Sequence, residues 1–145
     1  MFKRILLPTD GSDSSKRVIV DCMKLAKQIN AEVIGLIALP PYIPYVNEDG
    51  ELVDSRERLD REWVSYANRC LDDVRAAAKD AGVKCQTFHV IDNNPYEAIV
   101  ETAGNRRCDL IAMASHGRKG VKGFLLGSET QKVLTHCRIP VLVFR

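Results

Sequence analysis

The chain has 145 residues, the length of one ordinary domain and enough to bury a hydrophobic core without disulfides or a structural metal. Hydrophobic residues make up 46% of it and charged residues 28%, a composition that excludes an intrinsically disordered chain. The formal net charge is +2, from 21 basic and 19 acidic residues, so no global field favours nucleic acid or an anionic membrane, and we expect neither as a partner.

Apolar runs and cysteines in the sequence indicate the cellular compartment. No apolar run reaches the length of a membrane span, and the first four residues lead directly into a strand-like run, so we expect neither a membrane segment nor a signal peptide. The five cysteines are widely spaced and include no C-x-x-C pair, which indicates neither a disulfide framework nor a zinc site. We therefore expect a cytoplasmic protein.

The first half of the chain alternates short apolar runs with longer amphipathic ones. Residues 2–7 are predicted to form a buried strand that Pro8 ends, and residues 14–29 a helix with its apolar side chains on one face. A second strand follows at 32–39. The turn-rich segment 40–54 is predicted to be an ordered loop or lid, whose Tyr42 and Tyr45 either close over a ligand or pack against the next helix.

The second half continues the alternation. The longest helix is predicted at 55–81, with Gly82 after its last turn and a buried stripe at every third or fourth position. That stripe consists of Leu59, Trp63, Tyr66, Cys70, Val74, Ala77 and Ala81. A strand at 83–91 precedes a short helix, for which Asn94 is the expected cap, Pro95 the first helical residue and Glu97 the partner in a capping box. A strand at 109–114, a helix at 128–136 and a strand at 140–144 complete the chain.

This order, βαβαβαβαβ, predicts an α/β fold in one domain over residues 1–145. Near-continuous apolar strands alternating with helices are typical of a doubly wound parallel sheet with helices on both faces. The pattern alone leaves the strand order open. In such a fold, ligands bind at the carboxyl ends of the strands, where the winding reverses.

The loop after the first strand, Pro8-Thr9-Asp10-Gly11-Ser12-Asp13-Ser14, falls on that edge. Its hydroxyl and carboxylate groups could cap the following helix, or bind sugar hydroxyls or a hydrated Mg²⁺. Capping accounts for part of the set. Asp10 directly follows the strand, where a side chain points into the ligand crevice, so Asp10 is the candidate binding residue of this loop.

The loop after the fourth strand, residues 114–130, is rich in glycine, hydroxyl groups and cations. Its glycines allow a ligand to approach the backbone closely, and successive amides can form an anion-binding nest. Gly127-Ser128 then opens a helix, whose unpaired N–H groups favour a phosphate. The segment lacks the Walker A lysine, and the first loop lacks G-x-G-x-x-G, which disfavours both a P-loop and a dinucleotide Rossmann site. His116 either contacts phosphate or bonds to the backbone.

These two loops together resemble the nucleotide-binding branch of the universal stress protein family. Its pattern G-2x-G-9x-G-[ST] after the fourth strand aligns with Ala114, Gly117 and Gly127-Ser128, with alanine in place of the first glycine. Its P-x-D segment aligns with Pro8-Thr9-Asp10, and the closing strand with 139–143. The resemblance covers essentially the whole chain.

The resemblance implies an adenine-nucleotide-hydrolase-like fold with strand order 3-2-1-4-5 and a stress-response protein that binds ATP, or AMP or ADP. It places the adenine beside the backbone near Ala38, Asp10 on the ribose side, where it could reach Mg²⁺ through water, and the phosphates around the second loop. The nucleotide-binding set that it implies is Pro8, Thr9, Asp10, Ala38, Met113, Ser115, His116, Gly117, Arg118, Gly127, Ser128, Glu129 and Thr130. It also implies a homodimer formed by antiparallel pairing of the last strands, Val141 to Phe144.

Other functions remain open at this point. A slow ATP hydrolase would need a general base, for which only Asp10 and His116 stand out. A stress protein that has lost nucleotide binding is supported only by Ala114, whose methyl group we expect to weaken binding at most. A phospho-accepting receiver domain is disfavoured, because no lysine directly follows the fourth strand and Asp10 and Asp13 are separated. We expect a regulatory or protective nucleotide-binding protein with no catalytic residue.

Overall fold

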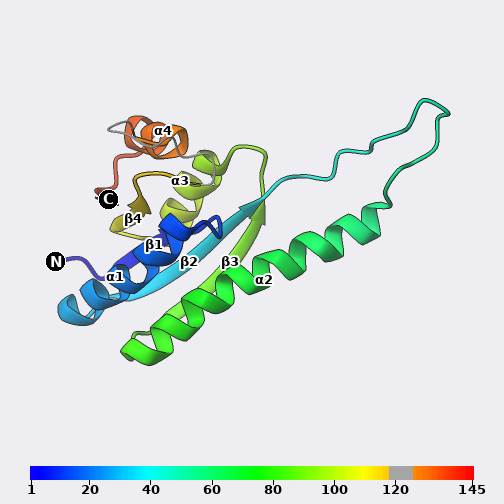
Figure 1. The fold of residues 1–145 in the computed structure, drawn as a ribbon. Helices are drawn as coiled ribbons and strands as arrows, with labels where there is room; N and C mark the ends of the chain where they lie inside the picture. The colour runs from blue at the N-terminus through cyan, green and yellow to red at the C-terminus, as the bar shows by residue number, and fades with distance from the viewer. Residues whose placement is uncertain (118–125) are drawn as a thin grey trace.

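A five-stranded, all-parallel β-sheet forms the centre of the structure, a computed structural model that describes residues 1–117 and 126–145 (Figure 1). The strand order is β3-β2-β1-β4-β5, which confirms the order implied by the resemblance. The winding reverses between β1 and β4, and this point is where ligands bind in such sheets. The strands are β1 (Arg4–Pro8), β2 (Glu32–Leu39), β3 (Cys85–Ile91), β4 (Leu110–Ala114) and β5 (Val141–Phe144).

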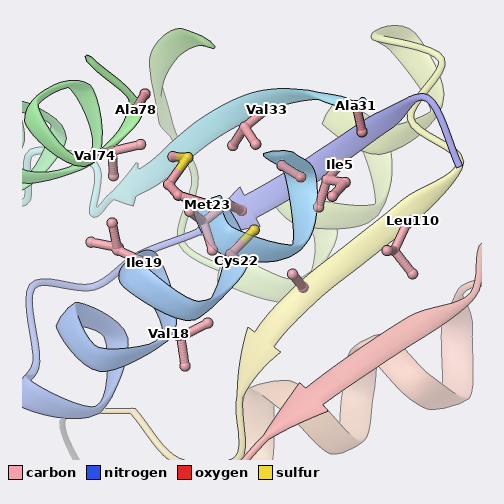
Figure 2. Packing of buried hydrophobic residues seen from close by; sticks show 13 residues of the cluster. Ile5, Val18, Ile19, Cys22, Met23, Ala31, Val33, Val74, Ala78 and Leu110 are labelled. Atoms are coloured by element: carbon pink, nitrogen blue, oxygen red, sulfur yellow. The ribbon is translucent and has the colours of Figure 1, made fainter. Parts of the chain in front are cut away.

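The helices cover both faces of this sheet. Side chains of the first two helices pack on one face, where Cys22, Met23 and Val74 meet the inner strands in the cluster drawn in Figure 2. Side chains of the last two pack on the other face, with Ile99 and Val133 against the inner strands. The helices are α1 (Asp13–Ile29), α2 (Arg56–Ala81), α3 (Pro95–Asn105) and α4 (Ser128–His136).

Helix caps explain several of the element boundaries. Ser55 and Ser12 accept a backbone N–H at the start of α2 and α1, so both serines precede their helices. Gly82, with a φ of 67°, ends α2, and the N–H of Val83 is donated to the carbonyl of Ala78. Because Val83 belongs to this cap, β3 begins at Cys85, two residues later than predicted.

The buried stripe of α2 differs from the predicted one. Cys70 and Val74 are buried, whereas the other predicted residues are only partly buried. Figure 1 shows part of the cause: the first turns of α2, with the preceding segment 40–55, extend beyond the sheet. Over the sheet, the helix also buries residues that the predicted stripe missed, namely Ala67, Leu71 and Ala78.

The segment between β2 and α2 ends in a small hairpin. Val46 and Leu52 form an antiparallel bridge around a turn in which the Asn47 side chain accepts two backbone N–H groups. The segment is therefore ordered, as predicted, although Ile43 and Tyr45 are 71% and 70% exposed.

All five cysteines are free. Burial raises the pKa of the Cys22 thiol to about 12 and that of Cys108 to about 11, so both remain protonated at neutral pH. Among the described residues, none of the helices is long and apolar enough to cross a membrane.

Candidate functional site

A pocket of about 680 Å³ opens at the carboxyl ends of β1 and β4. Such a volume falls within the roughly 300–1,000 Å³ typical of small-molecule sites. Eleven of the thirteen residues in the implied nucleotide-binding set line it. These eleven are Pro8, Thr9, Asp10, Ala38, Met113, His116, Gly117, Gly127, Ser128, Glu129 and Thr130.

Two residues of that set are not part of the described wall. The hydroxyl of Ser115 lies 3.0 Å from Nδ1 of His116, and Ser115 itself does not line the pocket. Arg118 lies outside the described residues. Tyr42 and Tyr45 do not line the pocket either; the hydroxyl of Tyr42 donates to the carbonyl of Asp54 at 3.3 Å.

The β1–α1 loop holds Asp10 in a defined orientation. Its Oδ1 accepts the N–H of Ser12 at 2.9 Å and the hydroxyl of Ser15 at 2.8 Å. The other oxygen, Oδ2, faces Gly117 across the sheet edge so closely that a Cβ built there would lie 2.5 Å from it. Ser15 lines the pocket as well, although sequence analysis assigned it no site role. Asp10 therefore joins the two loops that the sequence singled out.

The end of β2 contributes backbone groups. The carbonyl of Leu36 accepts the N–H of Thr9 at 2.8 Å, so Leu36 directs its backbone polar groups towards β1. Ala38, two residues on, has the same orientation, but the pairing of β1 with β2 ends at Pro8 and Leu36. The N–H and C=O of Ala38 are consequently directed past the end of β1, on the side where Ala38 lines the pocket.

The second loop closes on itself around Gly127. The N–H of Gly127 donates to the carbonyl of Ser115 at 2.6 Å, and the hydroxyl of Thr130 donates to the carbonyl of Ala114 at 3.0 Å. A Cβ at Gly127 would lie 3.1 Å from that Ser115 oxygen and 3.3 Å from Cα of His116. A side chain at 127 would thus press against the protein's own backbone, before any ligand is considered.

The start of α4 presents backbone donors to the pocket. Gly127 is its N-cap and provides no side-chain oxygen, and the first helical hydrogen bond runs from the N–H of Gln131 to Gly127. The N–H groups of Ser128 and Glu129 precede that bond and have no intrahelical partner. Both residues line the pocket, which therefore contains the positive end of a helix.

The side chain of Glu129 also makes contacts outside the pocket that the sequence did not predict. Its Oε2 accepts the backbone N–H of Tyr96 at 2.8 Å and its Oε1 the ammonium of Lys132 at 3.2 Å. Glu129 therefore caps α3 from a different helix. The predicted capping box is wrong, since Asn94 makes no side-chain cap bond and Glu97 instead accepts the Tyr96 hydroxyl. That hydrogen bond raises the pKa of Tyr96.

His116 contains the one buried side-chain polar atom without a hydrogen-bond partner in the described part of the chain. This atom is Nε2. Buried polar groups in proteins nearly always have a partner, so this nitrogen on the pocket wall can bond to a water molecule or a ligand. Within the described residues, no cluster of three or more His, Cys, Asp or Glu side chains could hold a metal ion without other ligands.

The rest of the wall was not predicted. Asn93 comes from the β3–α3 connection and Pro95 and Ile99 from α3, while Gln131 follows the predicted phosphate residues on α4. Only knowledge of the sheet order and of the packing of α3 beside α4 could have found the first three. The remaining lining residues are Leu36, Leu126 and Ala114, of which Ala114 is the alanine that stands in place of the motif's first glycine.

Comparison with known proteins finds relatives in the universal stress protein family. The sequence profile of the universal stress protein family matches residues 1–145. A universal stress protein of Thermus aquaticus is 33% identical over 146 aligned residues, which cover all of both chains.

Two solved structures have the same fold. A universal stress protein in complex with cAMP is 24% identical, with a TM-score of 0.75 over 99% of this chain and 97% of its own. One from Archaeoglobus fulgidus in complex with dAMP is 16% identical, with a TM-score of 0.69 over 100% of this chain and 98% of its own.

Proposed function

Because the chain belongs to the universal stress protein family, we propose that it binds an adenine nucleotide (ATP, or ADP or AMP) in the pocket between β1 and β4. The observation that best supports this proposal is that the pocket wall has an apolar part and a polar part. One part is apolar and includes the exposed backbone end of β2, whereas the other contains a carboxylate and a helix N-terminus. A nucleotide has the same division into a flat base and a polar ribose with phosphates.

The adenine is assigned to the apolar part, beside Leu36, Ala38 and Met113. Adenine presents an N–H donor next to a ring-nitrogen acceptor on its base-pairing edge. The adjacent C=O and N–H of Ala38, which lack a partner in β1, are the complementary pair. Ile99 and Pro95 add apolar surface for the faces of the ring.

The ribose and phosphates are assigned to the polar part. Asp10 presents Oδ2 for a ribose hydroxyl, or for a water molecule on Mg²⁺ held by the phosphates, the usual way in which proteins bind this ion. The N–H groups of Ser128 and Glu129 and the unsatisfied Nε2 of His116 suit the phosphates. The carboxylate of Glu129 is already paired with Lys132 and a backbone amide, which reduces its repulsion of a bound anion.

The relatives support the choice of ligand. The two solved structures named above hold cAMP and dAMP, both of which are adenine nucleotides. Our proposal extends this class of ligand to the present chain. We propose a regulatory or protective role in the stress response for the bound protein, and the free cysteines suit a reducing compartment such as the cytoplasm.

Calorimetric titration with ATP and Mg²⁺ tests the proposal. We expect saturable, submillimolar binding of one nucleotide per chain. GTP should bind at least about tenfold more weakly, because guanine presents an acceptor and a donor in the reverse order and would leave the Ala38 groups unpaired. No heat at several millimolar ATP, or equal affinity for GTP, would count against the assignment.

We also propose a homodimer that pairs the last strands. β5 is an edge of the sheet, and Leu142 on it is 37% exposed. The carbonyls of Pro140 and Phe144 accept N–H groups from β4 and from Ser115, which follows it, so the alternate residues Val141 and Val143 direct their backbone groups to the open edge. A second copy related by two-fold symmetry would pair with these groups.

The orientation of β5 identifies the informative substitution. Val143→Pro removes an outward N–H and places a ring at the edge, a position where a strand tolerates proline. We expect light scattering to show a dimer for the wild type at tens of micromolar and a monomer for this variant. Leu142→Pro is the contrasting control, since it removes an N–H directed to β4 and should destabilise the fold. A wild-type monomer, or a dimeric Val143→Pro variant, would contradict the proposal.

A further inference from the structure

Helix α2 contacts the β1–α1 loop at the backbone of Asp10. The hydroxyl of Tyr66 donates to the backbone carbonyl of Asp10 at 2.6 Å, across 56 residues of sequence. Tyr66 is partly buried, and its ring meets Trp63 edge-to-face with a centroid separation of 6.0 Å. The tyrosine is thereby fixed in place by its own helix and contacts a residue of the pocket wall.

The next residue of the loop depends on the same helix. Gly11 has a φ of 77°, in the left-handed region that favours glycine. A Cβ on Gly11 would lie 2.5 Å from the Tyr66 hydroxyl oxygen and 2.7 Å from Sγ of Cys70. The loop therefore turns against α2 with no room between them, so α2 fixes the backbone at the Asp10 carbonyl and at Gly11.

From this geometry we propose that Tyr66 is a positioning residue for nucleotide binding, acting through Asp10. The inference rests on the proposed function. The hydroxyl of Tyr66 fixes the main chain of Asp10 by its hydrogen bond to the carbonyl, while Ser12 and Ser15 fix Oδ1 by theirs. With both held, Oδ2 faces Gly117, and both residues line the pocket. Tyr66 itself does not line the pocket, so it acts only through the loop.

Tyr66→Phe removes the hydroxyl and keeps the ring. Loss of one hydrogen bond corresponds to a two- to tenfold change in an equilibrium constant, and we expect the Kd for ATP to rise by about that factor. The midpoint of urea unfolding without nucleotide is measured alongside, to show that the variant is folded. Tyr45→Phe is the matched control, since Tyr45 is 70% exposed and lies outside the pocket, and its Kd should equal that of the wild type.

A double-mutant cycle with Asp10→Asn separates positioning from a general structural effect. If Tyr66 acts through the Asp10 carboxylate, Tyr66→Phe should raise the Kd in the wild-type background and leave it unchanged in the Asp10→Asn background. An equal rise of the Kd in both backgrounds would overturn the inference. A wild-type Kd in the Tyr66→Phe variant, or in the Asp10→Asn variant, would also overturn it. In each of those cases the wild type still binds ATP. A wild type that binds no adenine nucleotide would instead refute the proposed function, and the inference with it.

Discussion

Replacing Gly117 with alanine should weaken ATP binding about 10- to 100-fold and lower the free energy of unfolding by about 1–3 kcal/mol. The new methyl group would lie 2.5 Å from Oδ2 of Asp10, so that carboxylate must move. Because Ser12 and Ser15 hold Oδ1, the carboxylate cannot turn aside without losing those bonds. A hydrogen bond to a charged group contributes about 1.5–3 kcal/mol, which gives the expected factor.

Gly104→Ala is the matched control for this substitution. A Cβ at Gly104, near the end of α3, has no neighbour within 4 Å, and the residue is exposed. Its affinity for ATP should equal that of the wild type. Binding is measured by calorimetry and stability by urea unfolding. If Gly117→Ala bound ATP as tightly as Gly104→Ala, Asp10 would not contribute to the site in the way assigned here.

Gly127→Val should lower both stability and affinity. A side chain at 127 meets the backbone of Ser115 and His116, which cannot move as a flexible side chain would. Such overpacking costs typically about 1–3 kcal/mol, and here it would also displace the α4 N-terminus from its bond to Ser115. We expect a fall of that size in the free energy of unfolding and at least a tenfold loss of ATP affinity.

The sequence pattern alone suggested that this glycine serves only the ligand, in which case stability would be unchanged. The two explanations therefore differ in the unfolding measurement. Gly104→Val is the control, because a valine there has open space and replaces glycine, the less favourable of the two residues in a helix. Wild-type stability and wild-type affinity in Gly127→Val would refute the role assigned to the loop.

Much of the fold could be predicted because the local sequence signals for each element agree with its packing in the tertiary structure. The boundaries of β2 and α4 agree with prediction to the residue. Prolines, glycines and apolar periodicity are sufficient where an element lies wholly over the sheet. They are insufficient for α2, whose first turns extend past the sheet and whose buried residues Ala67, Leu71 and Ala78 lie outside the predicted stripe.

The site shows the same limit. Asp10, Gly117 and Gly127 could be found because parallel strands bring their following loops to one edge. The contact of Glu129 with Tyr96 and that of Tyr66 with Asp10 could not, since each joins elements far apart in the sequence. Local capping rules even predicted the wrong partner for α3, because they consider only neighbours along the chain.

A crystal structure of the protein with ATP and Mg²⁺ would show directly whether the nucleotide lies between β1 and β4. We expect one nucleotide per chain, with the adenine edge hydrogen-bonded to the backbone of Ala38, a ribose hydroxyl or a metal-bound water at Asp10, and phosphate oxygens at the N–H groups of Ser128 and Glu129. A nucleotide bound outside this pocket, or bound with its base and phosphates exchanged, would contradict the proposed function.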